Sequence, residues 1–351
     1  MYTDKGEYHG GMNMNQNYVA DANRLFLCSI VGSKLLLNLV STIGVRDAMA
    51  LQLLIEVFMA LPCVFYLVSR RESFITRPEI YKMGAVQWIL LLPLALCVDK
   101  IAEFVNVFSQ LFTQNQIANH MLELVLQYPF PVAFFVIAVV PAVCEELIYR
   151  VVLYRGYRRS SALLAVLLTA FLFGIMHMNL NQFSYAFILG ILFALINEAA
   201  GSVLPSVVLH LYINGRSVVL LYTTVNFLEG LREQYIAAKA AGNTELMQEL
   251  SEQANGVPIQ KEDWLNAFMM TDNGDVLQSV FALLPYFLIA VIGVMLIICF
   301  LFRSTGRKGL FREMFQRKGT GYKEERAENK LSFLTPSLLV GCAFCIAYMI
   351  L

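Results

Sequence analysis

Charged side chains are scarce in this sequence. Of its 351 residues only 15% are charged, whereas 58% are hydrophobic, and the mean hydropathy is +0.61. A soluble domain carries roughly 25% charged residues, so the composition excludes a water-soluble globular protein, and it equally excludes a disordered chain. Lys and Arg together number 26, as do Asp and Glu, which leaves no net positive charge to attract nucleic acid. We therefore expect a protein that lies in a lipid bilayer and has no nucleic-acid partner.

The sequence also lacks the motifs of two common hydrolase classes. It contains no Gly-x-Ser-x-Gly element, which carries the nucleophile of many serine hydrolases, and no His-Glu-x-x-His zinc motif. Ser184 and Ser202 stand without a matching base pattern. Serine-based catalysis therefore has little support.

Paired cysteines are absent as well. The seven cysteines are odd in number and lie in or at the ends of apolar runs, where they are typical of small buried side chains. They are Cys28, Cys63, Cys97, Cys144, Cys299, Cys342 and Cys345. We expect no disulfide framework, and no zinc or redox role for the closely spaced Cys342 and Cys345.

Long apolar runs dominate the chain. A helix needs about 20 mostly apolar residues to cross the hydrocarbon core, and on that measure the sequence predicts an all-α membrane bundle of eight or nine spans. The nine candidates are residues 25–45, 49–69, 83–98, 123–144, 160–180, 183–199, 203–222, 278–302 and 331–351. Residues 101–118 are amphipathic and are predicted to lie at the membrane interface.

Polar segments divide the chain into four parts. We expect N-terminal spans in 1–122, a core in 123–222, an external polar insertion in 223–277, and C-terminal spans around a basic loop in 278–351. The middle of the insertion has helix-forming composition and is predicted to make one or two short helices.

Loop charges predict the orientation, because Lys and Arg accumulate on the cytoplasmic side. Basic residues are concentrated in 70–82, 150–159 and 303–330, and the last of these carries nine Lys or Arg against four Glu. Nine spans place these segments on one side with the N-terminus, and place the acidic segment 223–277 on the other. We expect a cytoplasmic N-terminus and, because no cleavage site follows the first apolar run, a retained first span.

Two charged residues lie in the first two spans. A charge at the centre of a bilayer costs roughly 2.5–3.5 kcal/mol on insertion scales, so charges there are usually paired or functional. Lys34 and Glu56 could reach similar depth on antiparallel helices, and we expect them to form a structural pair.

A denser group of polar residues falls in the fourth, fifth and seventh spans. Two of the chain's four histidines are among them. The group consists of Glu145, Glu146, Arg150, Phe173, His177, His210 and Asn214, with Pro141 just before it. Packing alone does not explain two adjacent carboxylates, two imidazoles and a carboxamide inside apolar spans.

Helical spacing assigns these residues to faces. Glu146 and Arg150 are four residues apart and can pair on one face, while Glu145 lies roughly 100° around the helix and stays available for chemistry. The same four-residue spacing joins Phe173 to His177, and His210 to Asn214.

Two further features concern the shape of these helices. Pro141 can bend the fourth span just before the carboxylates. A stripe of small residues, Ala186, Gly190 and Ala194, predicts close approach of a neighbouring helix. Straight helices would not bring Glu145, His177 and His210 to one depth, so bending at Pro141, tilt, or a fifth span that starts lower in the membrane is expected.

Three interpretations of the polar group remain open. Glu145 can act as the general base for a water that attacks a carbonyl, with the histidines and Asn214 donating to the oxyanion. Alternatively, Glu145, His177 and His210 could bind zinc, with Glu146 as the base. The group could also serve as polar contacts between helices. Taken jointly, the residues favour catalysis.

The three motifs, EExxxR, FxxxH and HxxxN in that order on successive helices, resemble those of the CPBP intramembrane proteases. That group includes the type II CAAX prenyl endopeptidases and the Abi-type proteins of bacteriocin processing and immunity. The resemblance covers about 123–222, and it implies a bundle of about eight membrane helices that hydrolyses peptide bonds within the membrane.

The resemblance also implies roles for the residues. It makes Glu145 the activator of the catalytic water, with His177 and His210 assisting it or binding metal, and Asn214 stabilising the oxyanion. Glu146 and Arg150 become a supporting pair, with Phe173 beside them. Whether the family needs a metal is itself open, so zinc is not asserted.

The implied substrate is a membrane-associated peptide or protein, with prenylated proteins as one class, and membrane lipid surrounds the site. The breadth of the family favours a bacterial plasma membrane. Two alternatives are a non-catalytic bacteriocin-immunity or scaffold protein and a proton-coupled transporter, since intramembrane Glu, His and Asn also build proton relays.

Overall fold

The computed structural model describes residues 18–69, 83–113, 116–158, 161–254, 257, 273–307, 309 and 333–350. Every regular element in these ranges is helical, which confirms the predicted all-α class. The helices are α1 (Tyr18–Thr42), α2 (Ala48–Ser69), α3 (Ala85–Ser109), α4 (Gln116–Gln127), α5 (Phe130–Phe134), η2 (Phe135–Val139), α6 (Val140–Glu146), η3 (Leu147–Leu153), α7 (Tyr154–Arg158), α8 (Ala162–Ile175), α9 (Leu180–Ala200), α10 (Leu204–Ala240), α11 (Thr244–Gln253), α13 (Asn273–Ser304) and α16 (Pro336–Ile350).

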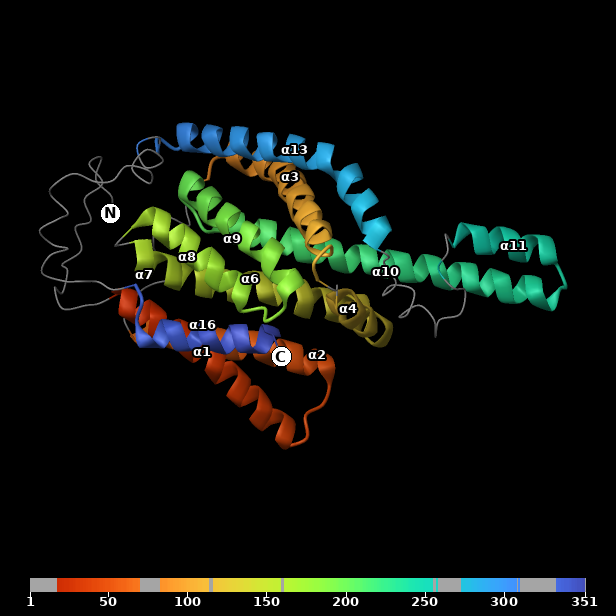
Figure 1. Cartoon of the computed structure of the whole chain (residues 1–351), viewed down its shortest axis with the longest axis horizontal. Helices are drawn as coiled ribbons and strands as arrows, with labels where there is room; N and C mark the ends of the chain where they lie inside the picture. Colours follow the sequence, from red (N-terminus) through yellow and green to blue (C-terminus); the bar gives the residue numbers. More distant parts are fainter. Residues whose placement is uncertain are drawn as a thin grey trace, which may run out of the picture.

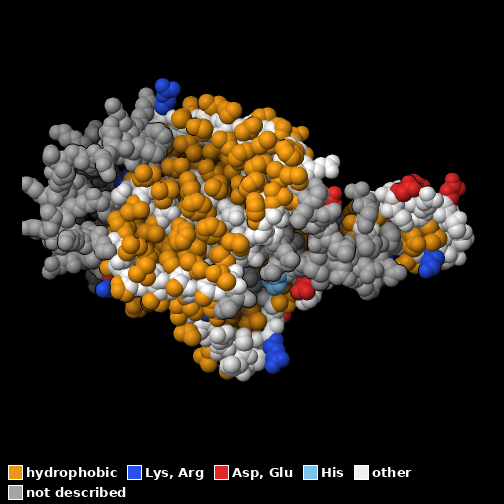
Figure 2. Space-filling view, in the orientation of Figure 1, with side chains coloured by type: hydrophobic (Ala, Val, Ile, Leu, Met, Phe, Trp, Pro, Cys, Tyr) orange, Lys and Arg blue, Asp and Glu red, His pale blue; other side chains and the backbone are white. Residues whose placement is uncertain are grey.

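The helices form a layered bundle (Figure 1). The central helices α6, α8, α9 and α10 lie between α3 and α13 on one side and α1, α2 and α16 on the other. Among the residues that the structure describes, six helical stretches are long and apolar enough to cross a membrane, and α8 and α16 are shorter apolar helices. Hydrophobic side chains cover most of the visible face of the bundle (Figure 2), as a lipid-facing surface requires. The protein is an integral membrane protein.

The stretch Phe130–Arg158 is one continuous helical rod that carries two wider, π-helical turns. In η2 the N–H of Val140 donates to the carbonyl of Phe135, and in η3 the N–H of Tyr154 donates to the carbonyl of Tyr149. These turns flank α6, the short segment with the two predicted carboxylates. π-Helical turns are rare and occur frequently at functional sites.

Small residues bring α8 and α9 together, as the stripe in the sequence predicts. A Cβ atom added at Gly190 would lie 2.7 Å from the Cα of Ala170 on α8. Ala186 and Ala194 are buried one turn to either side. This close approach holds the helix that carries Phe173 against the centre of the bundle.

Two segments differ from the sequence prediction. Residues 101–109, predicted to lie at the interface, continue α3 to Ser109, and the rest of that stretch leads into α4. The first part of the predicted insertion is the continuation of α10 to Ala240, and α11 folds back against it. Leu231 and Leu250 are buried where the two helices meet, which explains why a polar stretch stays helical beyond the bundle.

The predicted pair of Lys34 and Glu56 is wrong. The ammonium group of Lys34 lies 5.6 Å from the ring centroid of Tyr348 on α16, and no ion pair joins Lys34 to Glu56 in the described structure. The two helices do pack together, but α16 also packs on α1 and Glu56 is buried on α2. Lys34 therefore lies against α16 instead of pairing with Glu56 on α2.

Several predictions fall on residues outside this description. The basic segment 70–82, most of the basic segment 303–330 and the polar residues 1–17 lie outside it. The predicted orientation therefore stays a prediction, as does the division of the chain into four parts.

Candidate active site

The pair of Glu146 and Arg150 lies at the centre of the bundle, as the four-residue spacing predicts. Glu146 Oε2 is 3.3 Å from Arg150 Nε, and both side chains are at least 98% buried. The guanidinium carbon of Arg150 also lies 4.4 Å from the ring centroid of Phe173 on α8 and 5.3 Å from that of Phe193 on α9. Two aromatic faces therefore help to offset a cation that has no access to water.

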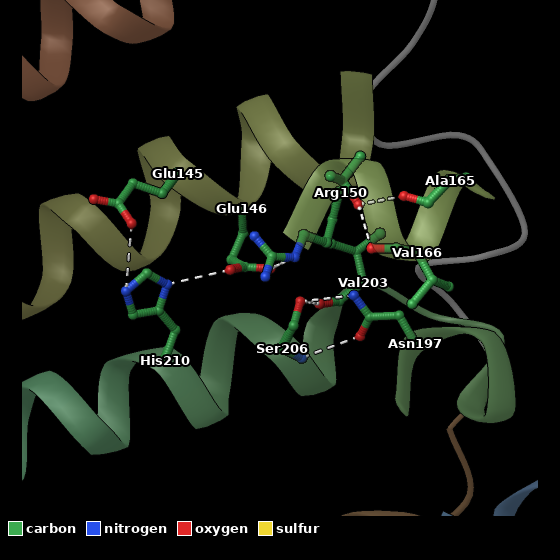
Figure 3. Close-up of polar contacts among 10 residues, drawn as sticks. Glu145, Glu146, Arg150, Ala165, Val166, Asn197, Val203, Ser206 and His210 are labelled. Atoms are coloured by element: carbon green, nitrogen blue, oxygen red, sulfur yellow. Dashed lines mark hydrogen bonds and ion pairs between the residues drawn. The ribbon is translucent and has the colours of Figure 1, made fainter. Parts of the chain in front are cut away.

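His210 joins this pair to the second carboxylate (Figure 3). Its Nδ1 is 3.2 Å from Glu146 Oε1, and its Nε2 is 3.6 Å from Glu145 Oε2. Because Arg150 keeps the Glu146 carboxylate ionised, that carboxylate can only accept a hydrogen bond, so Nδ1 of His210 carries the proton. In neutral His210 the lone pair of Nε2 therefore faces Glu145.

Glu145 makes fewer contacts than Glu146 in the described structure. It is buried, with 5% of its surface exposed, and its Oε2 makes no hydrogen bond in the described part of the chain. Its 3.6 Å contact with His210 is longer than an ordinary hydrogen bond. This arrangement leaves a lone pair of Glu145 able to bind a water molecule.

His177 lies at the end of α8 rather than within a helix. The helix ends at Ile175, and His177 follows in a turn, where its Nδ1 is 2.8 Å from the carbonyl oxygen of Phe173. A carbonyl only accepts hydrogen bonds, so Nδ1 is the donor and the Nε2 of the neutral ring is an acceptor. The sequence predicts the shared face of Phe173 and His177, but not the end of the helix between them.

The Phe173 ring connects His177 to the rest of the group. It packs edge-on against His177 at 5.2 Å between centroids, and against His210 at 5.9 Å. Together with the Arg150 contact, these ring contacts place Phe173 between His177 on one side and Arg150 and His210 on the other. In the described structure no hydrogen bond or ion pair joins His177 directly to either carboxylate of the group.

Asn214 lies one turn beyond His210 on α10 and contacts the rod before the carboxylates. Its Nδ2 donates to the carbonyl of Ile137 at 3.4 Å. Pro141, four residues after Ile137, has no N–H to donate to that carbonyl, so the Asn214 amide takes the place of the missing donor. Asn214 has two N–H bonds on this nitrogen, and one remains for another acceptor.

The structure therefore brings most of the predicted residues into one group. Glu145, Glu146, Arg150 and His210 are in direct contact, and Phe173 packs on Arg150 and on both predicted histidines. Asn214 lies at the edge of the group, anchored to η2.

Sequence reasoning missed two neighbours of the group. Phe193 packs 5.8 Å from His210 as well as against Arg150, and an aromatic residue in an apolar helix gives no signal of this role. Ser206 is one turn before His210 and receives two contacts from Asn197 on α9. The repeated four-residue spacing of Ser206, His210 and Asn214 is the signal that could have found it.

The residues as placed do not fit a zinc site. The described residues contain no group of three His, Cys, Asp or Glu side chains arranged to hold a metal ion. Of the three candidate ligands, His177 and His210 each keep Nε2 as an acceptor, as a metal ligand must, but only His210 and Glu145 are in direct contact among the described residues. We therefore derive no step through a metal.

Comparison with known proteins agrees with the motifs. Residues 127–216 match the family model described as Rce1-like, type II CAAX prenyl endopeptidase Rce1-like. The match runs from the end of α4 into α10 and contains every predicted site residue, which confirms the resemblance to CPBP and CAAX proteases. No curated protein and no solved structure matches the chain.

The buried pair predicts a difference between two substitutions. Arg150→Ala should lower the melting temperature of the detergent-solubilised protein and its folded yield strongly, because removing one partner of a buried ion pair typically costs about 3–5 kcal/mol. Glu145→Gln should change both quantities little, because Glu145 has no such partner. Thermal unfolding followed by circular dichroism measures the difference.

Arg24→Ala is the matched control for this experiment. It breaks an ion pair with Asp21 in which the arginine is 71% exposed, and such pairs contribute at most about 1 kcal/mol. Equal melting temperatures for Arg150→Ala and Glu145→Gln would contradict the assignment of Glu146 and Arg150 as the supporting pair.

Proposed function

We propose that this protein is an intramembrane endopeptidase in which Glu145 activates water to hydrolyse a peptide bond. The single observation that carries the proposal is the position of Glu145. It is a buried carboxylate that has no Lys or Arg partner among the described residues and lies 3.6 Å from a histidine whose other nitrogen contacts the Glu146–Arg150 pair. The family match over 127–216 supports the same class of reaction.

The first step is attack by water. Glu145 accepts a proton from the water, and the water oxygen forms a bond to the carbonyl carbon of the scissile peptide. The Nε2 of His177 is an acceptor, because Nδ1 donates to Phe173. It can therefore accept a hydrogen bond from the same water and orient it. We therefore propose His177 as a second acceptor for the water that Glu145 activates.

The second step is the departure of the amine. The carbonyl oxygen carries negative charge in the tetrahedral intermediate, and the remaining N–H of the Asn214 amide can donate to it. Glu145 then returns its proton to the nitrogen of the breaking C–N bond, which leaves a free amine and a new carboxyl group. No proton is gained or lost by the site over the cycle.

His210 has a different role in this scheme. Its Nδ1 proton is already donated to Glu146, so the Nε2 of the neutral ring is an acceptor that faces Glu145. While Glu145 carries the proton taken from water, its hydroxyl can donate a hydrogen bond to this Nε2. His210 thus steadies the protonated Glu145 until the proton passes to the leaving nitrogen, and it does not donate to the oxyanion.

The substrate that fits this site is a membrane-anchored peptide or protein. Most of the surrounding helices expose apolar side chains, as a lipid-facing surface does, so a scissile bond must reach the buried residues from a chain held in or at the membrane. Prenylated proteins are one class of such substrates, and the family description points to them.

Cleavage of a membrane-anchored reporter peptide tests the proposal. Purified wild-type protein in lipid vesicles should cleave the reporter, and Glu145→Gln should lower kcat by about 10²–10⁴-fold, because loss of a general base has that effect. His177→Ala should also lower kcat, by a smaller factor. Mass spectrometry identifies the products.

The matched control is Glu103→Gln on α3, which removes a half-exposed carboxylate paired with Lys100 and should leave kcat unchanged. Equal processing by wild type, Glu145→Gln and His177→Ala would exclude the proposed protease mechanism. It would favour the scaffold or transporter alternatives.

The two roles of Asn214 can be separated by a second substitution. Asn214→Ala should lower kcat by about 10²-fold or more through loss of an oxyanion donor, and should also lower stability because Ile137 loses its donor. Adding Pro141→Ala supplies a backbone N–H four residues after Ile137. Stability should then recover, while kcat stays low.

Melting temperature and kcat of the two variants are measured side by side. Recovery of kcat together with stability in the double variant would show that Asn214 acts only through the helix contact. That result would exclude it as an oxyanion donor.

A further inference from the structure

Two adjacent residues at the end of α9, Asn197 and Glu198, contact the two helical segments that carry the carboxylates and His210. Asn197 contacts the start of α10, and Glu198 contacts α7, at the end of the rod that contains Glu145 and Glu146. Neither residue belongs to the group described above.

Asn197 holds the beginning of α10 at two points (Figure 3). Its Oδ1 accepts from the backbone N–H of Ser206 at 3.2 Å, and its Nδ2 donates to the Ser206 hydroxyl at 2.7 Å. The residue at the N-cap of α10, Val203, has no side-chain acceptor for these N–H groups. Asn197 therefore caps α10 from a neighbouring helix.

Glu198 holds the end of the rod in the same way. Its carboxylate is 94% buried and accepts a hydrogen bond from the Tyr154 hydroxyl at 2.8 Å. Arg158 binds both carboxylate oxygens, through Nε and through Nη2, and such two-point contacts fix relative orientation as well as distance. The backbone of the same turn is tied to the end of α13, because Arg307 donates to the Glu198 carbonyl at 3.1 Å.

Both contacted residues lie one helical turn from a residue of the candidate site. Ser206 lies one helical turn before His210, and Tyr154 lies one turn after Arg150. A helix is stiff over one turn, so a displacement at Ser206 or Tyr154 shifts His210 or the carboxylates by a similar amount. Two adjacent residues of α9 thus hold both sides of the gap between His210 and the carboxylates. Asn197 holds the helix that carries His210, and Glu198 holds the helix that carries the carboxylates.

We infer that Asn197 and Glu198 are positioning residues that set the distance between His210 and the two carboxylates. This inference rests on the proposed function, because the distance matters for turnover only if the group is catalytic. A misplacement of about 1 Å can cost 10²-fold in rate. The anchors should therefore affect kcat more than substrate binding.

The kinetic test uses the reporter peptide and the full-length protein. Asn197→Ala should lower kcat about 10- to 100-fold with KM nearly unchanged, and Glu198→Ala should do the same. Glu198→Gln retains an acceptor for Tyr154 or Arg158 and should recover part of the loss. Ser217→Ala is the control, because this exposed serine on α10 bonds only the carbonyl of Ile213 in the described structure, and kcat should stay at the wild-type value.

A double-mutant cycle separates positioning from general destabilisation. If Asn197 acts through His210, Asn197→Ala should have no further effect on the residual kcat once His210 is replaced by Gln. A purely structural role predicts the same relative loss in both backgrounds, and that result would overturn the inference. Where Asn197→Ala gives no folded protein, Asn197→Asp replaces it, because it keeps the acceptor for the Ser206 N–H and removes the Nδ2 donor to the Ser206 hydroxyl.

A measurement that does not depend on enzyme activity tests this inference separately from the proposed function. The chain has only four histidines, so 15N-histidine solid-state NMR in bilayers gives few signals, and loss of a signal in His210→Gln assigns His210. The assigned signals should show a hydrogen-bonded Nδ1–H in wild type and in Ser217→Ala, and a shifted or broadened resonance in Asn197→Ala. An unchanged His210 resonance in Asn197→Ala would overturn the inference even if wild type cleaves the reporter. A wild-type protein that fails to cleave would contradict only the proposed function.

Discussion

The buried ion pair between Glu146 and Arg150 is the interaction on which the candidate site depends. Its two charges lie four residues apart on one rod, away from water, and two aromatic rings from α8 and α9 lie against the guanidinium. Because the pair keeps Glu146 ionised, it fixes the Nδ1 proton of His210, and so determines what His210 can offer to Glu145. Two adjacent carboxylates thus have separate roles, because within the described part of the chain only Glu146 is paired with an arginine.

Contacts between helices, rather than loops, position the side chains around this ion pair. The close approach of α8 and α9 at Gly190 brings Phe173 and Phe193 to the same cation. The π-helical turns and Pro141 change the hydrogen bonding of the rod next to the carboxylates, and Asn214 uses a carbonyl that Pro141 leaves available. The irregular backbone is thus placed where the polar side chains of other helices can satisfy it, as a membrane interior requires.

The sequence could predict contacts between residues on the same helix, because these follow from helical spacing. The faces shared by Glu146 and Arg150, and by Phe173 and His177, follow from helical spacing, and both are found in the structure. Contacts between helices depend on the rotation of each helix about its axis, which one sequence does not reveal. For that reason Lys34 faces Tyr348 instead of Glu56, and the contacts of Asn197 with Ser206 could not be foreseen. The end of α8 before His177 was also missed, because Gly174 is followed by further apolar residues and no Pro marks the end.

The most direct test of the account is an experimental structure of the wild-type protein in lipid, at a resolution that defines the side chains of α6, η3 and α10. The account predicts that the His210 ring lies between the two carboxylates, with Nδ1 within hydrogen-bond distance of Glu146 and Nε2 facing Glu145. A structure in which Glu145 points to lipid, or in which His210 contacts neither carboxylate, would contradict it.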